Sequence, residues 1–182
     1  MALTSTVYNF DIQLSDVDRG VYETLAIRAA CHPSETEEYL VTRLLAYCLE
    51  YTEGIAFSKG LSDPNEPAIL VRDLTGTITA WIEIGAPDAA RLHKASKASP
   101  RVAVYTHRDP AQLVKQLAGE RIHRAESIEI YRFDRVLIDG LVSRLDRRTV
   151  LDLAVTDRHL WVTIGGETLD GAVTRQHLEP AA

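Results

Sequence analysis

Residues 73–106 constrain the fold of this chain more than any other stretch. They contain a turn at Thr75-Gly76, a strand over 77–84, a helix over 88–99 and a second strand over 101–106. The second strand is a short β-branched run, which is typical of a strand buried on both faces. A strand, a helix and a further strand in this order predict a partly parallel sheet with helices packed on it.

The remaining segments extend this sheet at both ends. Alternating residues over 3–14 and 21–30 predict an opening antiparallel hairpin. A helix is expected after His32-Pro33, with Ser34 and Glu37 as a capping box and an end before Gly54. Further strands are expected at 55–58, 70–74, 128–131, 149–155, 159–165 and 167–174, and further helices at 109–118 and 134–145. We therefore predict a single α/β domain over residues 1–182, with a mixed sheet and hairpins at both ends.

Composition narrows the class of protein. The chain is 46% hydrophobic and 25% charged, with a net charge of −6, which is ordinary for a globular domain. It shows no secretory signal pattern and no apolar run of about 20 residues, so we expect a cytoplasmic protein without membrane spans. Cys31 and Cys48 are isolated and match no zinc spacing. The acidic balance means that nucleic-acid binding would need a locally positive groove or metal ions.

Two carboxylates in the opening stretch suggest chemistry. Asp73 precedes the turn, and Glu83 lies inside the apolar run Ala80-Trp81-Ile82-Glu83-Ile84. A carboxylate is costly to bury unless a cation satisfies it. If 70–74 and 77–84 pair as a hairpin, both acids can lie on one sheet face and hold Mg²⁺, which would polarise a phosphodiester and activate water.

Each of these residues also has a simpler interpretation. Asp73 can serve as a turn residue that caps Thr75-Gly76. Glu83 can be a solvent-facing position between two core residues, because side chains alternate along a strand. Lys94 and Lys97 can be solvated residues on a helix surface. The acids at 35, 37 and 38 can simply favour the N-terminus of their helix.

Several long phrases resemble the bacterial YaeQ family. They are VYNFDIQLSDVDRGVYETLAIRAACHPSE, HPSETEEYLVTRLLAYCLEY, FSKGLSDPNEP, RDLTGTITAWIEIGAPD and RLHKASKASPRVAVYTH, which cover about the first two thirds of the chain. The resemblance implies a small domain with a restriction-endonuclease-like, PD-(D/E)XK-type core. It implies no settled activity.

The resemblance also implies site residues. Asp73 matches the core aspartate and Glu83 matches the acidic member of the (D/E)XK strand, so both are the implied metal ligands. Gly85 stands where that pattern has a lysine, which leaves Lys94 on the following helix as the candidate replacement. Glu38 matches the additional acid that many nucleases of this fold carry on the first helix, although Glu37 is close by.

Two functions follow from this set of residues. The first is a Mg²⁺-dependent phosphodiesterase acting on nucleic acid, with Asp73 and Glu83 holding the metal, Glu38 assisting and Lys94 orienting the water or the developing charge. The second is a binding or regulatory protein that keeps the nuclease fold without catalysis, which Gly85 and the acidic net charge favour. Fold alone decides neither.

Overall fold

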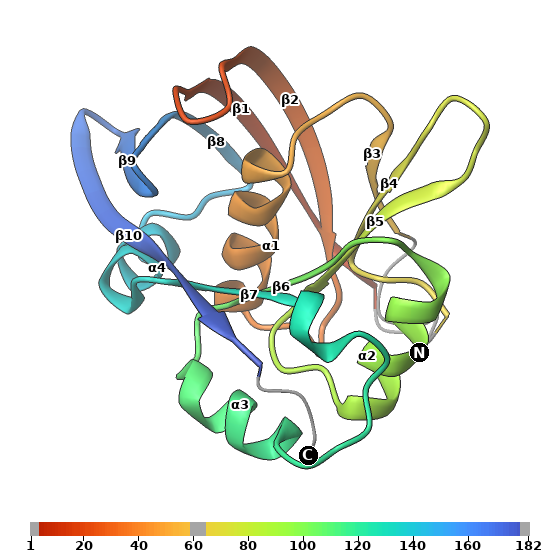
Figure 1. The fold of residues 1–182 in the computed structure, drawn as a ribbon. Helices are drawn as coiled ribbons and strands as arrows, with labels where there is room; N and C mark the ends of the chain where they lie inside the picture. Colours follow the sequence, from red (N-terminus) through yellow and green to blue (C-terminus); the bar gives the residue numbers. More distant parts are fainter. Residues whose placement is uncertain (1–3, 59–64, 179–182) are drawn as a thin grey trace. The chain divides into compact units, whose positions relative to one another are not determined.

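The computed structural model describes residues 4–58 and 65–178, and it shows an α/β protein built from two compact units. Unit 1 contains the chain up to Leu49 and residues 133–173, and unit 2 contains residues 50–132 and the chain from Thr174 onward. The chain therefore runs from unit 1 to unit 2, back again, and into unit 2 a second time (Figure 1).

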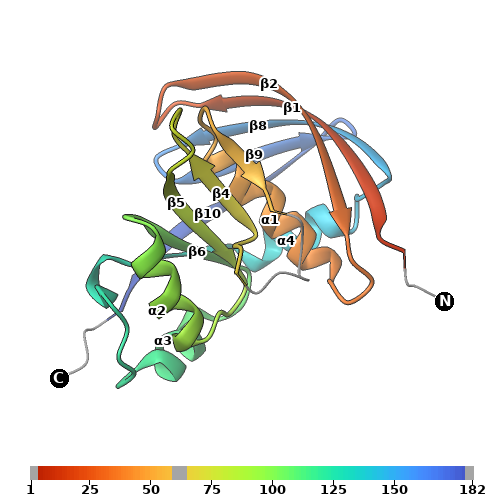
Figure 2. The ribbon, with the colours of Figure 1, turned by 90° about the vertical axis from the view of Figure 1, so that its right-hand side faces the viewer.

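Unit 1 is built on five neighbouring strands of the sheet, in the order β2-β1-β8-β9-β10. The strands are β1 (Thr6–Asp16), β2 (Val21–Cys31), β8 (Arg148–Thr156), β9 (His159–Ile164) and β10 (Glu167–His177), the last of which continues into unit 2. Only the β1–β8 pair is parallel among these neighbours (Figure 2). The turn between β8 and β9 is formed by Asp157 and Arg158, both at positive φ.

One face of this sheet is buried and the other is exposed, which follows from the period of two in its strands. In β1, Phe10, Ile12 and Leu14 are buried, whereas Asn9, Asp11 and Gln13 between them are exposed. Helix α1 (Glu37–Leu49) packs against helix α4 (Arg135–Val142) and against β2. Unit 1 therefore has its own hydrophobic core.

The first helix starts differently from the prediction. The Thr36 hydroxyl accepts a hydrogen bond from the Tyr39 backbone N–H at 3.1 Å, so Thr36 is the capping residue. The Ser34 hydroxyl instead lies 2.7 Å from His32 Nδ1. The capping box expected from Ser34 and Glu37 is therefore wrong, because the helix begins two residues later than that motif requires.

Unit 2 contains five further strands, in the order β3-β4-β5-β6-β7. The strands are β3 (Ile55–Phe57), β4 (Ile69–Arg72), β5 (Ile78–Ile84), β6 (Val102–Thr106) and β7 (Glu129–Phe133), and a short 3₁₀ turn, η1 (Ala125–Ser127), precedes β7. Strands β3, β4 and β5 are antiparallel, whereas β5, β6 and β7 are parallel. The mixed sheet predicted from the alternation of segments is confirmed.

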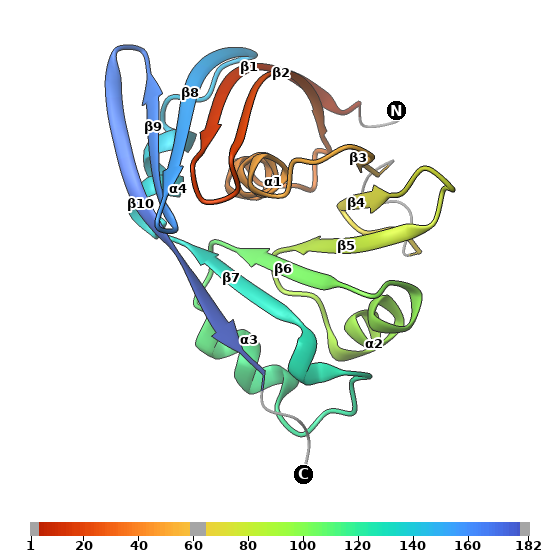
Figure 3. The same ribbon diagram turned by 45° about the horizontal axis from the view of Figure 1, so that its top comes forward.

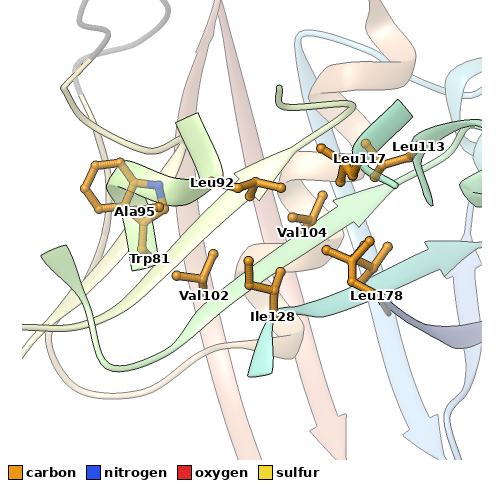
Figure 4. Packing of buried hydrophobic residues seen from close by; sticks show 10 residues of the cluster. Trp81, Leu92, Ala95, Val102, Val104, Leu113, Leu117, Ile128 and Leu178 are labelled. Atoms are coloured by element: carbon orange, nitrogen blue, oxygen red, sulfur yellow. The ribbon is translucent and has the colours of Figure 1, made fainter. Parts of the chain in front are cut away.

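Helices α2 (Ala89–Ala98) and α3 (Pro110–Leu117) lie on the same side of strands β5, β6 and β7 (Figure 3). The side chains of Asp88 and Asp109 cap their first turns by accepting backbone N–H groups. Both helices pack into one core with the strands below them (Figure 4). The buried members are Trp81, Leu92, Ala95, Val102, Val104, Leu113, Leu117, Ile128, Ile130 and Leu178.

Across residues 4–58 and 65–178, no helix is long and apolar enough to cross a membrane. The cytoplasmic location expected from the sequence stays a prediction. The restriction-endonuclease-like core also stays a prediction at this point, since an α/β architecture with a mixed sheet is a broader class.

Candidate functional site

Asp73 lies in the tight turn between β4 and β5, and its carboxylate holds that turn together. Asp73 Oδ1 accepts hydrogen bonds from the Thr75 N–H at 2.8 Å, the Thr75 hydroxyl at 2.6 Å and the Thr77 N–H at 3.0 Å. The hydrogen bond from the Thr75 hydroxyl, followed by that from the Thr77 backbone, lowers the pKa of the Asp73 carboxyl. The turn interpretation of Asp73 is confirmed.

The hairpin register separates Asp73 from Glu83. In the ladder Arg72 faces Ile78 and Ile69 faces Ile82, and the Asp73 N–H bonds the Thr77 carbonyl at 2.9 Å. Asp73 therefore lies beside Thr77, and Thr77 is six residues before Glu83 along the second strand of the hairpin. At roughly 3.3 Å per residue the two positions are about 20 Å apart along the strand. The expected convergence of these two carboxylates is therefore wrong: the hairpin forms, but it places them at opposite ends.

Glu83 is buried, with 4% of its surface exposed, and it already has two donors. Its Oε1 accepts a hydrogen bond from Trp81 Nε1 at 2.6 Å and from Arg91 Nε at 2.7 Å. Glu83 and Trp81 point to the same face of β5, because they are two residues apart, and helix α2 covers that face. The solvent-facing interpretation of Glu83 is wrong for this reason.

Arg91 is the residue that the sequence reasoning missed. It lies in the first turn of α2, where Asp88 accepts its backbone N–H at 2.8 Å, and its Nη2 donates to the Glu66 carbonyl at 2.7 Å. The guanidinium thus joins the buried carboxylate of β5 to the segment that precedes β4. The available signal was its position eight residues after Glu83, at the start of a helix that follows the same strand.

Lys94 is exposed one turn after Arg91 on α2, and its Nζ donates to Asn65 Oδ1. Because Arg91 contacts both Glu83 and Glu66, Lys94 and Glu83 lie in the same part of unit 2. The structure thus brings two of the four candidate residues into one neighbourhood.

Glu38 belongs to unit 1, whereas the other three candidates belong to unit 2. It lies in the first turn of α1 and is half-buried, and its backbone carbonyl accepts the Thr42 hydroxyl at 2.7 Å. Its proposed catalytic role stays a prediction.

The pair of acids does not fit Mg²⁺, which needs several oxygen ligands converging on one point. One carboxylate is engaged by Arg91 and Trp81, and the other closes a distant turn. No group of three or more His, Cys, Asp and Glu side chains in the described part of the chain is arranged to hold a metal ion.

Gly85 has a backbone reason for being glycine. Its φ is +95°, which an L-residue with a side chain rarely adopts, and its N–H bonds the Tyr105 carbonyl at 2.8 Å. A lysine at this position would be strained even though a Cβ would meet nothing within 4 Å. The departure from the nuclease pattern is therefore part of the local structure.

A second buried polar cluster lies at the β6–β7 pair. Arg101 donates to Glu50 at 2.6 and 2.9 Å and to Glu129 at 2.7 and 3.2 Å. The hydroxyls of Tyr105 and Tyr131 donate to Glu50 and Glu129, each at 2.6 Å, and their rings stack at 4.9 Å. Burial, followed by the nearby Glu50 charge, raises the pKa of Tyr105 well above its usual value. The cluster is internally paired and ties the start of unit 2 to its sheet.

Comparison with known proteins identifies the family of this chain. The family model described as "YaeQ protein" matches residues 1–173. The chain belongs to the YaeQ family. YaeQ proteins of Salmonella typhi and Escherichia coli (strain K12) are 30% and 29% identical to it over 175 residues, which is 96% of this chain and 97% of theirs. Both carry the name "Uncharacterized protein YaeQ".

Solved structures of the YaeQ family share the fold. The crystal structure of YaeQ from Pseudomonas syringae has a TM-score of 0.86 at 31% identity and covers 96% of this chain and 97% of its own. The YaeQ structure from Xanthomonas axonopodis pv. citri has a TM-score of 0.86 at 29% identity and covers 97% of this chain and 100% of its own. The family predicted from the sequence phrases is confirmed, and none of these relatives' names states a reaction.

Proposed function

We propose that this protein is a non-catalytic binding or regulatory member of the YaeQ family. One observation carries the proposal: the Glu83 carboxylate is held by Arg91 and Trp81 while Asp73 lies about 20 Å away along the hairpin. The only carboxylate in the buried part of the proposed site thus has an internal cation as its partner.

The energetics of Glu83 support this function. Removing the cationic partner of a buried carboxylate strongly destabilises a protein, so Arg91 already supplies the compensation that a metal ion would otherwise provide to Glu83. Arg91 is anchored at its other end by the Glu66 carbonyl. The positive φ of Gly85 disfavours the lysine that the nuclease pattern would supply beside this carboxylate.

The second candidate is the Mg²⁺-dependent phosphodiesterase. The shared neighbourhood of Glu83 and Lys94 favours it, since a lysine near a carboxylate can orient water or stabilise a developing charge. This reaction would use a carboxylate that Arg91 already neutralises, and it would need oxygen ligands from residues other than Asp73. It is therefore the weaker proposal.

Metal titration and a cleavage screen separate the two. We expect Mg²⁺ and Mn²⁺ to show the same affinity, by calorimetry, for wild type, Asp73→Ala and Glu83→Gln. We also expect no cleavage of single- or double-stranded DNA or RNA with either ion. Metal-dependent cleavage that disappears in Glu83→Gln, with circular dichroism showing an intact fold, would overturn the proposal in favour of the enzyme.

A further inference from the structure

Positive charge is concentrated in one segment of this acidic chain. Residues 89–124 contain eight Lys or Arg and two Asp or Glu, a net charge of +6. The whole chain carries −6, so the remaining residues carry −12. All of this segment belongs to unit 2 and includes both helices that cover its parallel strands. The local positive region that an acidic nucleic-acid binder would need is therefore present.

Six of these cations are exposed and form no ion pair in the part of the chain that the structure describes. Arg91 and Arg101 are committed to carboxylates, as described above. Arg108 and Lys115 belong to α3 and the loop before it. The other four belong to α2 and to the loop at 121–124, and they are Lys94, Lys97, Arg121 and Arg124.

Hydrogen bonds fix the loop that carries Arg121 and Arg124 beside helix α2, which carries Lys94 and Lys97. Arg124 Nη2 donates to the carbonyls of Ser96 and Ser99, at 2.6 and 3.1 Å, at the C-terminal end of α2. The Ser96 hydroxyl donates to the His123 carbonyl at 2.5 Å, and the His123 N–H donates to His93 Nδ1 at 3.1 Å. The loop that contains residues 121–124 is thus fixed against the last two turns of α2.

We call Lys94, Lys97, Arg121 and Arg124, with His93 and His123 between them, the basic surface. The packing beneath it is firm, because Leu92 and Ala95 of α2 are fully buried in the core shown in Figure 4. Glu120 and Glu126 are exposed at either end of the loop and limit the positive region there. The charges are therefore held on an ordered platform about two helical turns long.

The side chains of this region favour phosphate over other anionic partners. Its exposed positions include no large hydrophobic residue, since the exposed large hydrophobics are at 17, 22, 74, 136, 150 and 161. A membrane-binding surface usually adds apolar side chains that enter the lipid. The only Phe, Trp or Tyr of the segment is Tyr105, which is buried, so unpaired bases would find none of these large rings to stack on.

We propose that the basic surface binds double-stranded nucleic acid through its backbone phosphates, without reading the base sequence. This inference rests on the proposed binding function and names its partner. Lysine and arginine contacts to phosphate supply position and affinity but carry no direct sequence information. Four such contacts give a salt dependence with a slope of up to roughly −3.6 in log affinity against log salt concentration.

Fluorescence anisotropy with labelled duplexes of two unrelated sequences tests this. We expect wild type to bind both equally, with affinity that falls steeply between low and physiological salt. Lys97→Gln/Arg121→Gln should lose about tenfold in affinity and reduce the salt slope by about 2. The matched control is Arg28→Gln/Arg148→Gln, which removes the same charge from exposed residues of unit 1 and should change affinity less than about threefold.

Other results would overturn the inference. Equal losses in the two double variants would show non-specific attraction, and absence of duplex binding at low salt would remove nucleic acid as the partner. Binding to vesicles of anionic phospholipid without binding to duplex would assign the surface to membranes instead. The same samples run on a denaturing gel keep the two proposals apart: cleavage would overturn the non-catalytic function, whereas loss of binding alone would overturn only this inference.

Discussion

At the residue scale, Arg91 is the cationic partner of the buried Glu83 carboxylate. The Glu83 side chain is 5% exposed and the Arg91 side chain is 29% exposed, so the pair is partly screened by water. We expect Arg91→Ala to lower the free energy of unfolding by about 2 kcal/mol, because it leaves a buried carboxylate without its cation. Urea denaturation followed by circular dichroism measures this change.

The double variant Arg91→Ala/Glu83→Gln is the control for that experiment. It removes the buried charge together with its partner while Trp81 Nε1 keeps an oxygen acceptor. We expect it to recover more than half of the stability lost in the single variant. Equal destabilisation of the single and double variants would show that Arg91 acts through packing rather than through charge.

Glu129 provides a test by pH. Burial alone would raise the pKa of its carboxyl, but the hydrogen bonds from Arg101 and Tyr131 outweigh burial and hold the pKa below its usual value. The ionised Glu129 carboxylate therefore stabilises the folded state. This contribution is fully present above the ordinary carboxyl pKa of about 4.3, and it is lost as the pH falls through the lower pKa of the folded protein. Glu129→Gln should therefore lose less stability between pH 5 and 3 than wild type does.

Thermal unfolding midpoints across this pH range check the expectation. The exposed Glu126→Gln serves as the comparison, since it removes an equal charge three residues away without touching Arg101. A pH dependence in Glu129→Gln as steep as in wild type would contradict the assigned role of this carboxylate.

Sequence reasoning at this scale succeeded where one residue and its immediate neighbours decide the outcome. The turn role of Asp73 depends on Thr75 and Thr77 and was foreseeable. The burial of Glu83 was not, because it depends on α2 covering that face of β5 and on Arg91 reaching back from it. In the second cluster, Arg101 bonds Glu50, 51 positions away, and Glu129, 28 positions away, and no local pattern predicts such contacts.

At the scale of elements, two glycines of the β3–β4–β5 meander test how closely its strands approach: Gly54 precedes β3, and Gly76 lies in the turn between β4 and β5. Gly54 and Gly76 have φ values of +87° and +85°, so their backbone conformations are equally unfavourable for alanine. A Cβ on Gly54 would lie 1.9 Å from the Arg72 carbonyl oxygen, whereas one on Gly76 meets nothing within 4 Å.

We expect Gly76→Ala to cost about 1 kcal/mol of unfolding free energy and Gly54→Ala at least about 2 kcal/mol more. The difference isolates the steric overlap with the neighbouring strand, because the conformational cost is shared. Urea denaturation of both variants measures it. Equal costs would mean that β3 and β4 can separate slightly without loss.

The elements themselves were largely predictable, since local periodicity and capping determine them. The helix expected over 88–99 is observed as Ala89–Ala98, and the strand expected over 101–106 as Val102–Thr106. The pairing and register of the strands were harder to predict from the sequence. The sequence predicted the β4–β5 hairpin correctly. It did not predict that the hairpin would separate the carboxylates of Asp73 and Glu83, because that depends on where each residue lies along it.

At the scale of the whole molecule, the chain completes unit 2 with residues that follow the second segment of unit 1. Leu178 is 6% exposed and packs into the core beneath α2 and α3 (Figure 4). We expect Leu178→Ala to lower the free energy of unfolding by about 2–4 kcal/mol through the lost burial and the cavity that remains. The exposed Val136→Ala should change it by less than about 0.5 kcal/mol.

Amide hydrogen exchange shows which helices are destabilised by the Leu178→Ala substitution. In Leu178→Ala the amides of α2 and α3 should exchange faster, because these helices lose a packing partner. A variant as stable as Val136→Ala, with unchanged exchange in both helices, would show that the core closes without this residue. The interleaving of the units was absent from the sequence prediction of one domain, since no linker or change in composition marks where the chain passes between them.

The late arrival of Leu178 also has a consequence for synthesis. A ribosome releases the chain in order, so α2 and α3 emerge well before the residue that seals the apolar layer beneath them. During that interval the core lacks one of its buried members, and the apolar surface left exposed promotes aggregation of nascent chains. The growing polypeptide therefore passes through a stage in which α2 and α3 have been synthesised but their core is incomplete. Chaperones would bind the apolar surface exposed at that stage.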